Sequence, residues 1–351
     1  MGVTPAGPPS LPTARGPVTE GLLAGLRARP GTALPGAEGG DGWDEDLQLA
    51  LYLCYELHYR GFQGVDDDWE WDPELLRLRR DLESRFTETL RAELGPVPDV
   101  QEQLDGLLVE PLHGSGPSYF LRDRGERWQA REYLAHRSLY HLKEADPQAW
   151  ALPRLHGRAQ AGLLTVEFDE YGDGRPERMH SRLFAEMMAD LGLDPSYGRY
   201  LEAAPAPALA AVNLISLFGL HRAHRGALVG QFAAMEITSS PGADRLAQAL
   251  ARLGAGEAGI RFYREHVEAD AVHEQLVRRE VIGGLLAEEP ELAADVGFGL
   301  AASGLVEQRL GDYLVSCWEA GRSSLRVPLP EEAAVPSEAA AAPSAPSAPS
   351  A

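Results

Sequence analysis

The spacing of the apolar residues constrains this chain more than any other feature of its sequence. From about Trp43 to Gly321, apolar residues recur at intervals of three and four, and alternating runs of β-branched residues are scarce. Most residues in this region also favour helix. The pattern predicts an all-α fold of about ten helices. Because no repeat period of some tens of residues is visible, we expect a helical bundle rather than a repeat array.

Pro, Gly and helix-capping residues mark where the individual helices begin and end. The first predicted helix begins near Asp44 and ends at Gly61, and the second begins at Pro73 and ends before Gly95. The predicted helices cover residues 44–61, 73–94, 99–109, 127–145, 148–171, 176–192, 207–236, 241–253, 256–287, 290–302 and 303–321. We expect the helices before about residue 110 to form an accessory layer.

Composition changes at both ends of the chain. Residues 1–40 contain nine Gly and seven Pro, and 17 of the 21 residues in 331–351 are Ala, Pro or Ser. Neither segment is expected to bury enough apolar surface to offset the entropy cost of ordering it. The predicted organisation is a disordered tail over 1–40, accessory helices over 43–110, the main helical domain over 111–322 and a disordered tail over 325–351.

The charge balance excludes several classes of partner. The 351 residues include 53 acidic residues against 32 Lys and Arg, a formal net charge of −21. Such a chain repels phosphate backbones and anionic lipid headgroups, so we expect no nucleic-acid partner and no membrane partner. The uncharged run Ala203–Leu220 contains two prolines and Asn213, which favours a buried core helix over a membrane span.

Cysteine usage and the N-terminal sequence bear on the compartment. Cys54 and Cys317 are isolated and have no Cys-x-x-Cys partner, which argues against a disulfide scaffold, a zinc knuckle and a cysteine-ligated cluster. The N-terminus has no positively charged start followed by an apolar run and a small-residue cleavage site. A cytoplasmic location is therefore expected.

A histidine and aspartate motif lies in the predicted helix 256–287. The sequence FYREHVEADAVHEQL places His266, Asp270 and His273 at i, i+4 and i+7, which puts the three side chains on one helix face. Imidazole and carboxylate ligands together suit iron or manganese better than a metal that prefers thiolates. The alternative is a solvated polar face, as the charged neighbours Arg264 and Glu265 indicate for the opposite side.

A second candidate motif precedes it in the chain. Glu177 and His180 are spaced i, i+3 on a helix that is expected to begin at Pro176, and Glu-x-x-His is a pair that helical bundles use to hold two metal ions. Glu170 lies ten residues before His180, and the Gly and Pro residues between them break the helix so that Glu170 can turn towards the same centre. An ordinary acidic surface turn is the alternative.

Further candidates are single residues. Glu144 lies in the last turn of a helix terminated by Pro147, where the helix dipole disfavours a carboxylate, so another interaction is expected to hold it. Glu236 is a candidate as a further ligand or as a base beside the ligands, and Tyr140 and Tyr263 are candidates to line the site. Core packing is the alternative for each residue that we consider for substrate contact: Arg137, Tyr140, Tyr171, Asn213, His221 and Tyr263.

These motifs together carry a family resemblance. The segment LKEADPQAWALPRLHGRAQAGLLTVEFDEYGDGRPERMHSRLFAEMMADLGLD and the later HVEADAVH resemble the haem-oxygenase-like diiron oxidases, also called iron-containing redox enzymes. The resemblance extends over about Tyr133 to Leu286 and implies a haem-oxygenase-like helical bundle that binds two non-haem Fe(II) ions per chain. The metal ligands that it implies are Glu144, Glu170, Glu177, His180, His266, Asp270 and His273.

Glu170 is the position at which the family divides. Members that oxygenate nitrogen have a carboxylate ten residues before the Glu-x-x-His histidine, and members that decarboxylate fatty acids or fragment lysine lack it. The resemblance therefore implies a catalytic role for Glu170 in N-oxygenation of a small amine or amino acid in specialised metabolism. It further implies O2 as co-substrate, a peroxo-diferric intermediate, and an external reductant or electron-donor protein.

Two other functions stay open at this point. A diiron oxidase that catalyses desaturation or oxidative C–C cleavage is expected if Glu170 points away from the metals. A helical metal-binding protein without catalysis is the alternative from another class. The amphipathic helices before about residue 110 are a candidate homodimer face.

Overall fold

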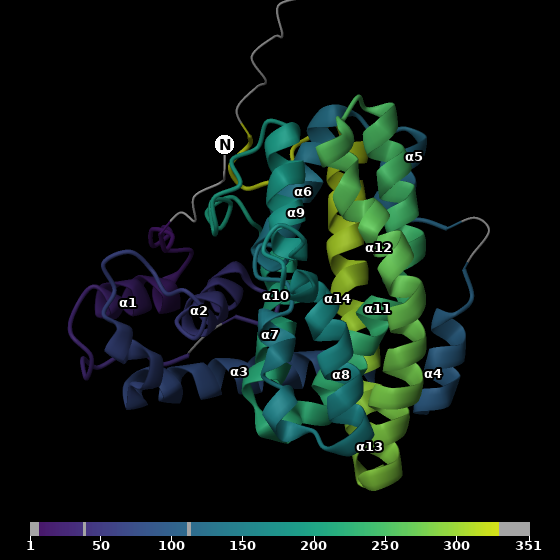
Figure 1. The fold of residues 1–351 in the computed structure, drawn as a ribbon. Coiled ribbons are helices and arrows are strands. Elements are labelled where there is room, and N and C mark those ends of the chain that lie inside the picture. Colours follow the sequence, from purple (N-terminus) through teal and green to yellow (C-terminus); the bar gives the residue numbers. More distant parts are fainter. Residues whose placement is uncertain (1–6, 38–39, 111–113, 330–351) are drawn as a thin grey trace, which may run out of the picture.

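Helices form all the regular secondary structure in residues 7–37, 40–110 and 114–329, which are the residues that this computed structural model describes (Figure 1). The all-α prediction is confirmed. The accessory layer contains α1 (Pro17–Leu26), which lies outside the predicted accessory segment 43–110, together with α2 (Glu45–Glu56) and α3 (Pro73–Leu94) from that segment. The last helix of the predicted segment, at residues 100–107, packs against the bundle instead. The remaining α-helices are α4 (Val100–Leu107), α5 (Pro117–Asp123), α6 (Arg127–His141), α7 (Asp146–Ala149), α8 (Gly157–Glu170), α9 (His180–Asp190), α10 (Ala206–Leu220), α11 (Arg225–Arg252), α12 (Glu257–Leu276), α13 (Gly283–Glu288) and α14 (Ala293–Glu319).

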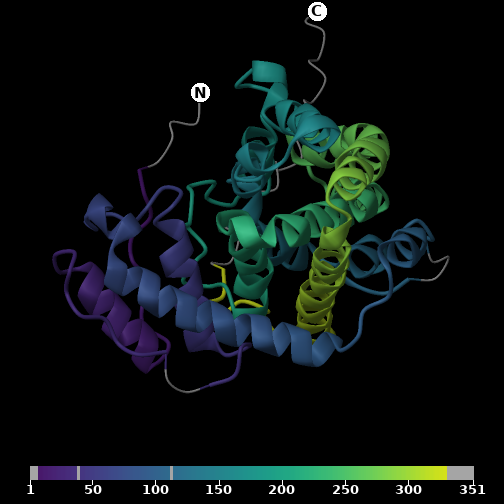
Figure 2. The ribbon, with the colours of Figure 1, turned by 90° about the horizontal axis from the view of Figure 1, so that it is seen from below.

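The accessory layer lies beside the long helices of the bundle. Helix α3 begins and ends as predicted, because Asp72 accepts hydrogen bonds from the backbone of Glu74 and Leu75, and Gly95 ends the helix with a φ of 60°. Seen from below, α3 runs from the accessory layer across to α14 (Figure 2). Helix α2 packs against α10 and is buried along most of its length. The accessory layer therefore shares its core with the bundle.

The prediction of a disordered tail over residues 1–40 is wrong for residues 7–37. Helix α1 buries Val18, Leu22 and Leu26, and the carboxylate of Asp46 in α2 accepts hydrogen bonds of 2.8 Å from the backbone N–H groups of Val18 and Thr19. The short apolar stripe of α1 is enough to order this segment, although Gly and Pro dominate its composition. Residues 1–6 and 38–39 lie outside the described residues.

The C-terminal tail prediction can be compared with the structure over only five residues. Leu325 is buried, and the backbone N–H of Arg326 donates to the carbonyl of Ala203, so the chain stays packed beyond the predicted domain end at residue 322. Residues 330–351 lie outside the described residues.

Helices α10, α11 and α14 form the centre of the bundle. Helix α10 is buried on nearly every side, which confirms the predicted core helix in this uncharged run. Helices α11 and α14 approach so closely that a Cβ atom on Gly230 would lie 2.1 Å from the carbonyl oxygen of Val296. No single helix in the described part of the chain is long and apolar enough to cross a membrane; α10 and Arg222–Arg252 meet that test only as a pair bent by 106°.

Several predicted helices have different limits in the structure. The predicted helix 207–236 is two helices, because His221 is extended between α10 and α11, and α11 continues through Pro241. The predicted helix 148–171 is broken before α8, where Gly157 has a φ of 50°. Helix α12 continues through a π-helical stretch, Val277–Ile282, into α13.

Candidate metal centre

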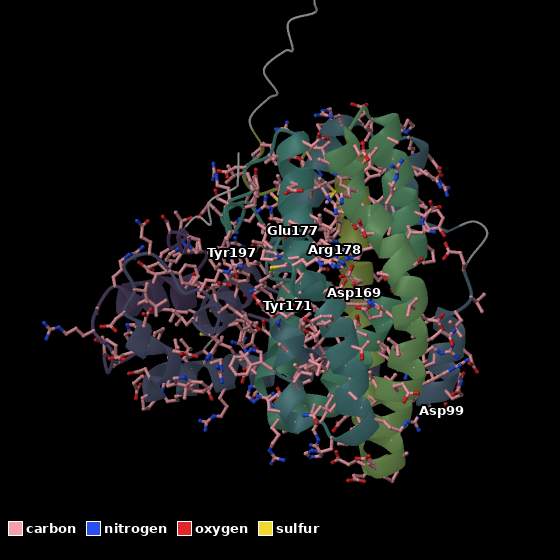
Figure 3. The ribbon with its side chains drawn as sticks, in the orientation of Figure 1. Asp99, Asp169, Tyr171, Glu177, Arg178 and Tyr197 are labelled. Atoms are coloured by element: carbon pink, nitrogen blue, oxygen red, sulfur yellow. The ribbon has the colours of Figure 1, made fainter. Side chains whose placement is uncertain are left out.

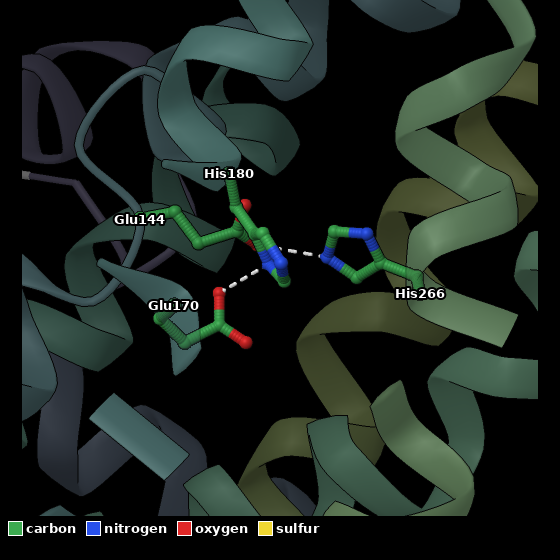
Figure 4. A group of neighbouring side chains, drawn as sticks. All are labelled: Glu144, Glu170, His180 and His266. Carbon is green, nitrogen blue, oxygen red and sulfur yellow. Dashed lines mark ion pairs between the residues drawn. The ribbon is translucent and has the colours of Figure 1, made fainter. Parts of the chain in front are cut away.

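Carboxylates and imidazoles from five parts of the bundle converge in its interior. Four side chains have donor atoms that all lie within 4.8 Å of one another, and a second group of three meets the same limit. The first group is Glu144, Glu170, His180 and His266 (Figure 4). The second group is Glu170, Glu236 and His273. Because Glu170 belongs to both groups, the two groups are adjacent, and its carboxylate lies between them.

The residues of the first group lie in different elements of the fold. Glu144 lies in the turn between α6 and α7, next to Ala145, whose φ of 74° is unusual for a residue other than Gly. Glu170 is the last residue of α8, and His180 is the first residue of α9. The prediction that Glu144 ends a helix over 127–145 is wrong, because α6 ends at His141.

The contact between His180 and Glu170 is short, but its geometry is not that of a hydrogen bond. Nδ1 of His180 lies 2.7 Å from Oε2 of Glu170, and neither buried atom has a hydrogen-bond partner among the described residues. Oε2 of Glu144 is likewise buried without a partner. Buried donors and acceptors are normally paired. Lone pairs that converge without hydrogen bonds fit a shared cation.

Hydrogen bonds outside the group orient His266. Its Nδ1–H donates to the carbonyl of Phe262 at 2.8 Å, which leaves the lone pair of Nε2 on the side of Glu144, 3.8 Å away. In metal-binding histidines, the ring nitrogen that does not face the metal typically donates a hydrogen bond of this kind to a backbone oxygen. The ring centroids of His266 and His180 are 4.4 Å apart.

His141 is a member of the site that the sequence reasoning missed. Its Nδ1 lies 2.7 Å from Oε1 of Glu144, and its ring stacks on Phe184 with centroids 4.8 Å apart. Burial raises the pKa of Glu144, but His141 and His266 outweigh burial and hold that pKa well below its usual range. The i, i+3 spacing of His141 and Glu144 is a signal that was available in the sequence.

The second group is arranged around His273. Nδ1 of His273 lies 3.0 Å from Oε2 of Glu236 and 3.8 Å from Oε1 of Glu170, whereas Nε2 lies 3.0 Å from Oδ2 of Asp169. A proton on Nε2 is accepted by Asp169 and leaves the lone pair of Nδ1 facing the two glutamates. Burial, with the nearby Glu170, raises the pKa of Glu236, although His273 opposes the shift. Asp169 was not among the predicted site residues.

Glu167 is a further buried carboxyl group that the sequence reasoning missed. Its residue is 2% exposed, and neither carboxyl oxygen has a hydrogen-bond partner within the described part of the chain. Burial, followed by the charges of Glu170 and Glu236, raises the pKa of Glu167 to about 9. Glu167 is therefore protonated and neutral at pH 7 in the metal-free protein. Its i, i+3 spacing from Glu170 places it on the same helix face.

The structure does not bring Glu177 into either group. Residues 176–178 form an exposed turn and α9 begins only at His180, so the prediction of a helix that begins at Pro176 is wrong (Figure 3). The positive φ values of Gly172, Asp173 and Gly174 reverse the chain after α8 and leave Glu177 exposed. Asp270 lies in α12, but its side chain is outside the described residues.

The predicted tyrosines lie near the centre. The hydroxyl of Tyr140 accepts a hydrogen bond of 2.8 Å from the side chain of Gln148, and burial together with Glu144 raises the pKa of Tyr140 well above its usual value. Tyr263 is buried, and Tyr171 donates to Asp146 at 2.8 Å. Figure 3 labels Tyr171 and Asp169 below Glu177 and Arg178 in that view.

Two candidates for substrate contact face the accessory layer instead. Asn213 donates from its side chain to the backbone and side chain of Gln48 in α2, at 2.8 Å each. Nε2 of His221 lies 2.9 Å from Oε1 of Glu83 in α3. These two side chains therefore connect the bundle to the accessory layer through polar contacts.

The donor set fits two divalent cations. Buried carboxylates at this density would repel one another strongly without positive charge, because each uncompensated buried ion costs several kcal/mol. Oxygen and imidazole donors suit iron or manganese, and both cysteines lie outside the two groups. An all-helical bundle whose core gathers carboxylates and histidines from facing helices is characteristic of non-haem metal proteins.

The comparisons with known proteins agree with this class. The model of the iron-containing redox enzyme family matches residues 131–307, about half of the chain, and the chain belongs to that family. A nitrosourea synthase from Streptomyces achromogenes subsp. streptozoticus is 28% identical over 160 residues, which cover 45% of this chain and 33% of that protein. The chain therefore matches about a third of the length of this relative. The family match includes every residue of the two groups and excludes α1–α5.

Proposed function

We propose that this protein is a non-haem diiron oxygenase that N-oxygenates a small amine or amino acid. Its family makes it an iron-containing redox enzyme. The observation that carries the finer proposal is the place of Glu170, whose carboxylate has donor atoms close enough to serve both groups. A carboxylate shared by two cations is the arrangement that couples two metal ions in helical bundles.

The residues fit such a centre in a definite way. Glu144, His180 and His266 would hold one Fe(II), Glu236 and His273 would hold the other, and Glu170 would bridge them. When bound, the two irons supply the electrons and the binding site for O2. The family resemblance implies Asp270 and Glu177 as further ligands of this centre. Glu177 can reach the centre only if the turn at 176–178 moves inward.

The surrounding residues supply orientation and exclude water. The aromatic rings of Phe184 and Phe262 pack against His141 and against each other, which keeps bulk water away from the first group. Asp169 orients His273, and the carbonyl of Phe262 orients His266. In the metal-free protein the neutral carboxyl group of Glu167 holds a proton on the same helix face as Glu170.

Two observations favour nitrogen over carbon as the oxidised atom. The glutamate ten residues before His180 is directed into the centre rather than away from it, as its contact with His180 indicates. The relative with 28% identity is named for making a nitrosourea, a compound with an oxidised nitrogen. Both support N-oxygenation over desaturation or C–C cleavage.

The test combines metal content with product analysis. Anaerobic protein loaded with Fe(II) should bind two irons per chain and consume O2 faster when a substrate amine is added. Products that contain hydroxylamine or nitro groups support the proposal, whereas an alkene or aldehyde favours the diiron oxidase alternative. Iron binding without O2 consumption in the presence of any amine tested would leave a non-catalytic metal-binding protein. Glu170→Ala, which removes a donor from both groups, should lose this substrate-dependent O2 consumption. Glu257→Ala, at an exposed position of α12, is the matched control and should keep it.

A further inference from the structure

A cavity beside the candidate metal centre opens to solvent between α8, α9 and α12. Its walls are the C-terminal end of α8, the turn that precedes α9, the first turn of α9 and one face of α12. Its volume is about 240 Å³, roughly the space of eight water molecules in the liquid. Because sites for drug-sized ligands begin at about 300 Å³, this cavity suits a smaller organic molecule.

The inner wall of the cavity belongs to the metal centre. His180 lines it with a side chain that is 5% exposed, and Nδ1 of His180 lies 2.7 Å from Oε2 of Glu170. Asp169 also lines it, and Oδ2 of Asp169 lies 3.0 Å from Nε2 of His273 in the second group. Leu183, one turn after His180, supplies apolar surface to this wall. A molecule in the cavity therefore touches residues that belong to or contact both groups.

The outer wall of the cavity carries charged side chains. Arg178 in the turn, and Arg261 and Glu265 in α12, line it with side chains that are 39%, 45% and 39% exposed. Arg178 and Asp169, which line the same cavity, are both labelled in Figure 3. Exposure falls from this charged outer wall to the buried His180. A solute can therefore pass from bulk water to a residue of the metal centre through this cavity.

The two arginines come to the cavity from segments far apart in the sequence. In the turn, Gly172 has a φ of 71°, and a Cβ atom at this position would lie 2.6 Å from the carbonyl carbon of Arg178. This close approach holds the backbone of Arg178 against the end of α8. Arg261 and Glu265 are spaced i, i+4 and share one face of α12. The turn and α12 thus bring two guanidinium groups to one opening.

Neither guanidinium group is held firmly by its own ion pair. Arg178 contacts Asp173 at 3.1 Å, and Arg261 contacts Glu265 at 3.5 Å. All four side chains are more than a third exposed, and such pairs contribute little because water competes for both charges. A guanidinium group presents parallel N–H donors that match a carboxylate. At this opening, the two arginines also offset the net charge of −21 that would repel an anion.

We propose that this cavity is the substrate site and that the substrate is a small amino acid whose carboxylate is bound by Arg178 and Arg261. The amino group of the substrate lies at the inner end, beside Asp169 and His180. Because the carboxylates of Asp169 and Glu265 also line the cavity, a ligand with only negative charge is repelled there, whereas a zwitterion finds a partner for each of its charges. The inference rests on the proposed function, because it names the substrate class for the same centre.

The experiment measures binding without turnover. Calorimetric titrations of the full-length protein, both metal-free and anaerobically loaded with Fe(II), compare each of the standard amino acids with its primary amide. The amide has nearly the same size but lacks the negative charge. We expect at least one amino acid to bind at least tenfold more tightly than its amide, because hydrogen bonds between charged groups contribute about this much.

Replacing the arginines tests whether they cause this preference. The double variant Arg178→Met with Arg261→Met should bind the amino acid at least tenfold more weakly and should bind the amide as before. Unchanged amide binding separates the loss of charge recognition from a general loss of structure. Arg182→Met is the matched control, because Arg182 forms an i, i+4 ion pair of similar exposure with Glu186 but does not line the cavity. This control should keep the full preference for the amino acid.

Three results would overturn the proposal: no binding of any standard amino acid, equal binding of amino acids and their amides, or an unchanged preference in the double variant. The ligand series on the unsubstituted protein decides the question even if the double variant does not fold. The two proposals also fail separately. Amino-acid binding that depends on Arg178 and Arg261 but leads to no O2-dependent nitrogen oxidation refutes the proposed function, whereas nitrogen oxidation that is insensitive to both substitutions refutes the cavity assignment.

Discussion

Lys143 and Glu56 form an ion pair of 2.9 Å in which the two side chains are 1% and 0% exposed. The pair joins the turn that follows α6 to α2 of the accessory layer. The hydroxyl of Tyr197 also donates to Glu56 at 2.7 Å, and the Lys143 ammonium lies 4.2 Å from the ring centre of Tyr59. Because Lys143 directly precedes Glu144, the accessory layer determines the position of a residue in the metal centre.

Glu56→Ala should therefore destabilise the protein strongly. Removing one member of a buried ion pair leaves the other charge uncompensated, which costs about 3–5 kcal/mol. Urea denaturation should show this loss, while Glu280→Ala, at an exposed ion pair, should change the free energy of unfolding far less. The double variant Glu56→Leu with Lys143→Met should recover much of the loss. A Glu56→Ala protein with unchanged stability would show that the pair contributes nothing.

Glu167→Gln should change how the stability of the metal-free protein depends on pH. The pKa of Glu167 is about 9 in the folded protein against 4.5 for an ordinary Glu, so between these values the folded state binds more protons than the unfolded state. The contribution of this bound proton to the free energy of unfolding is fully present below pH 4.5 and is lost as the pH rises towards 9. Each pH unit in this window removes about 1.4 kcal/mol, or about 3 kcal/mol between pH 6 and pH 8.

Denaturation curves of chelator-treated protein at pH 6 and pH 8 measure this effect. The glutamine variant needs no proton to stay neutral, so its free energy of unfolding should fall less between the two pH values than that of the unsubstituted protein. Glu257→Gln replaces an exposed carboxylate in α12 and should keep the original pH dependence. Parallel pH dependences for Glu167→Gln and the unsubstituted protein would contradict a neutral, buried Glu167.

Local sequence signals were sufficient for some elements of the fold. The limits of α3 follow from Asp72, Pro73 and Gly95, which act on their own helix ends. The core position of α10 follows from its uncharged sequence. The break between α10 and α11 could not be predicted in this way, because the extended His221 contacts Glu83 of α3, a residue more than a hundred positions earlier.

The residues of the candidate site likewise differ in whether sequence signals could identify them. Four of the ligands predicted from spacing and resemblance lie together in the structure: Glu144, Glu170, His180 and His266. The expected helical spacing of Glu177 and His180 failed because the turn after α8 consumes the residues that should have formed the first helical turn. Asp169 could not be identified from the sequence, since its role depends on α8 and α12 lying side by side.

His136 should make the protein less stable in acid. Burial, with the nearby charge of Arg137, lowers the pKa of His136 to about 3, so the folded protein keeps this imidazole neutral where the unfolded chain protonates it. The contribution of this neutral imidazole to the free energy of unfolding is fully present above pH 6.5 and is lost as the pH falls towards 3. It amounts to about 2 kcal/mol between pH 6.5 and pH 5.

A phenylalanine at position 136 isolates this effect. His136→Phe loses the hydrogen bond of 3.0 Å between Nε2 and the hydroxyl of Ser324, so it should be less stable at pH 7. Its free energy of unfolding should nevertheless fall about 2 kcal/mol less between pH 6.5 and pH 5 than that of the unsubstituted protein. Equal losses for the two proteins, measured by urea denaturation, would exclude a buried neutral imidazole as the cause.

Metal binding should distinguish Glu170 from the other carboxylates. A ligand that binds only the folded state stabilises it by about 2.7 kcal/mol per site at a free concentration a hundredfold above its Kd. Anaerobic Fe(II) should therefore raise the free energy of unfolding by about 5 kcal/mol if both groups bind a cation. Glu144→Ala removes a donor from the first group alone and should keep about half of this gain, whereas Glu170→Ala removes a donor from both groups and should lose most of it.

The gain on adding Fe(II), rather than the stability of the metal-free variant, is the quantity to compare, because loss of Glu170 also relieves repulsion with Glu236 and Glu167. Two irons per chain in Glu170→Ala, with the full gain in stability, would refute a shared carboxylate.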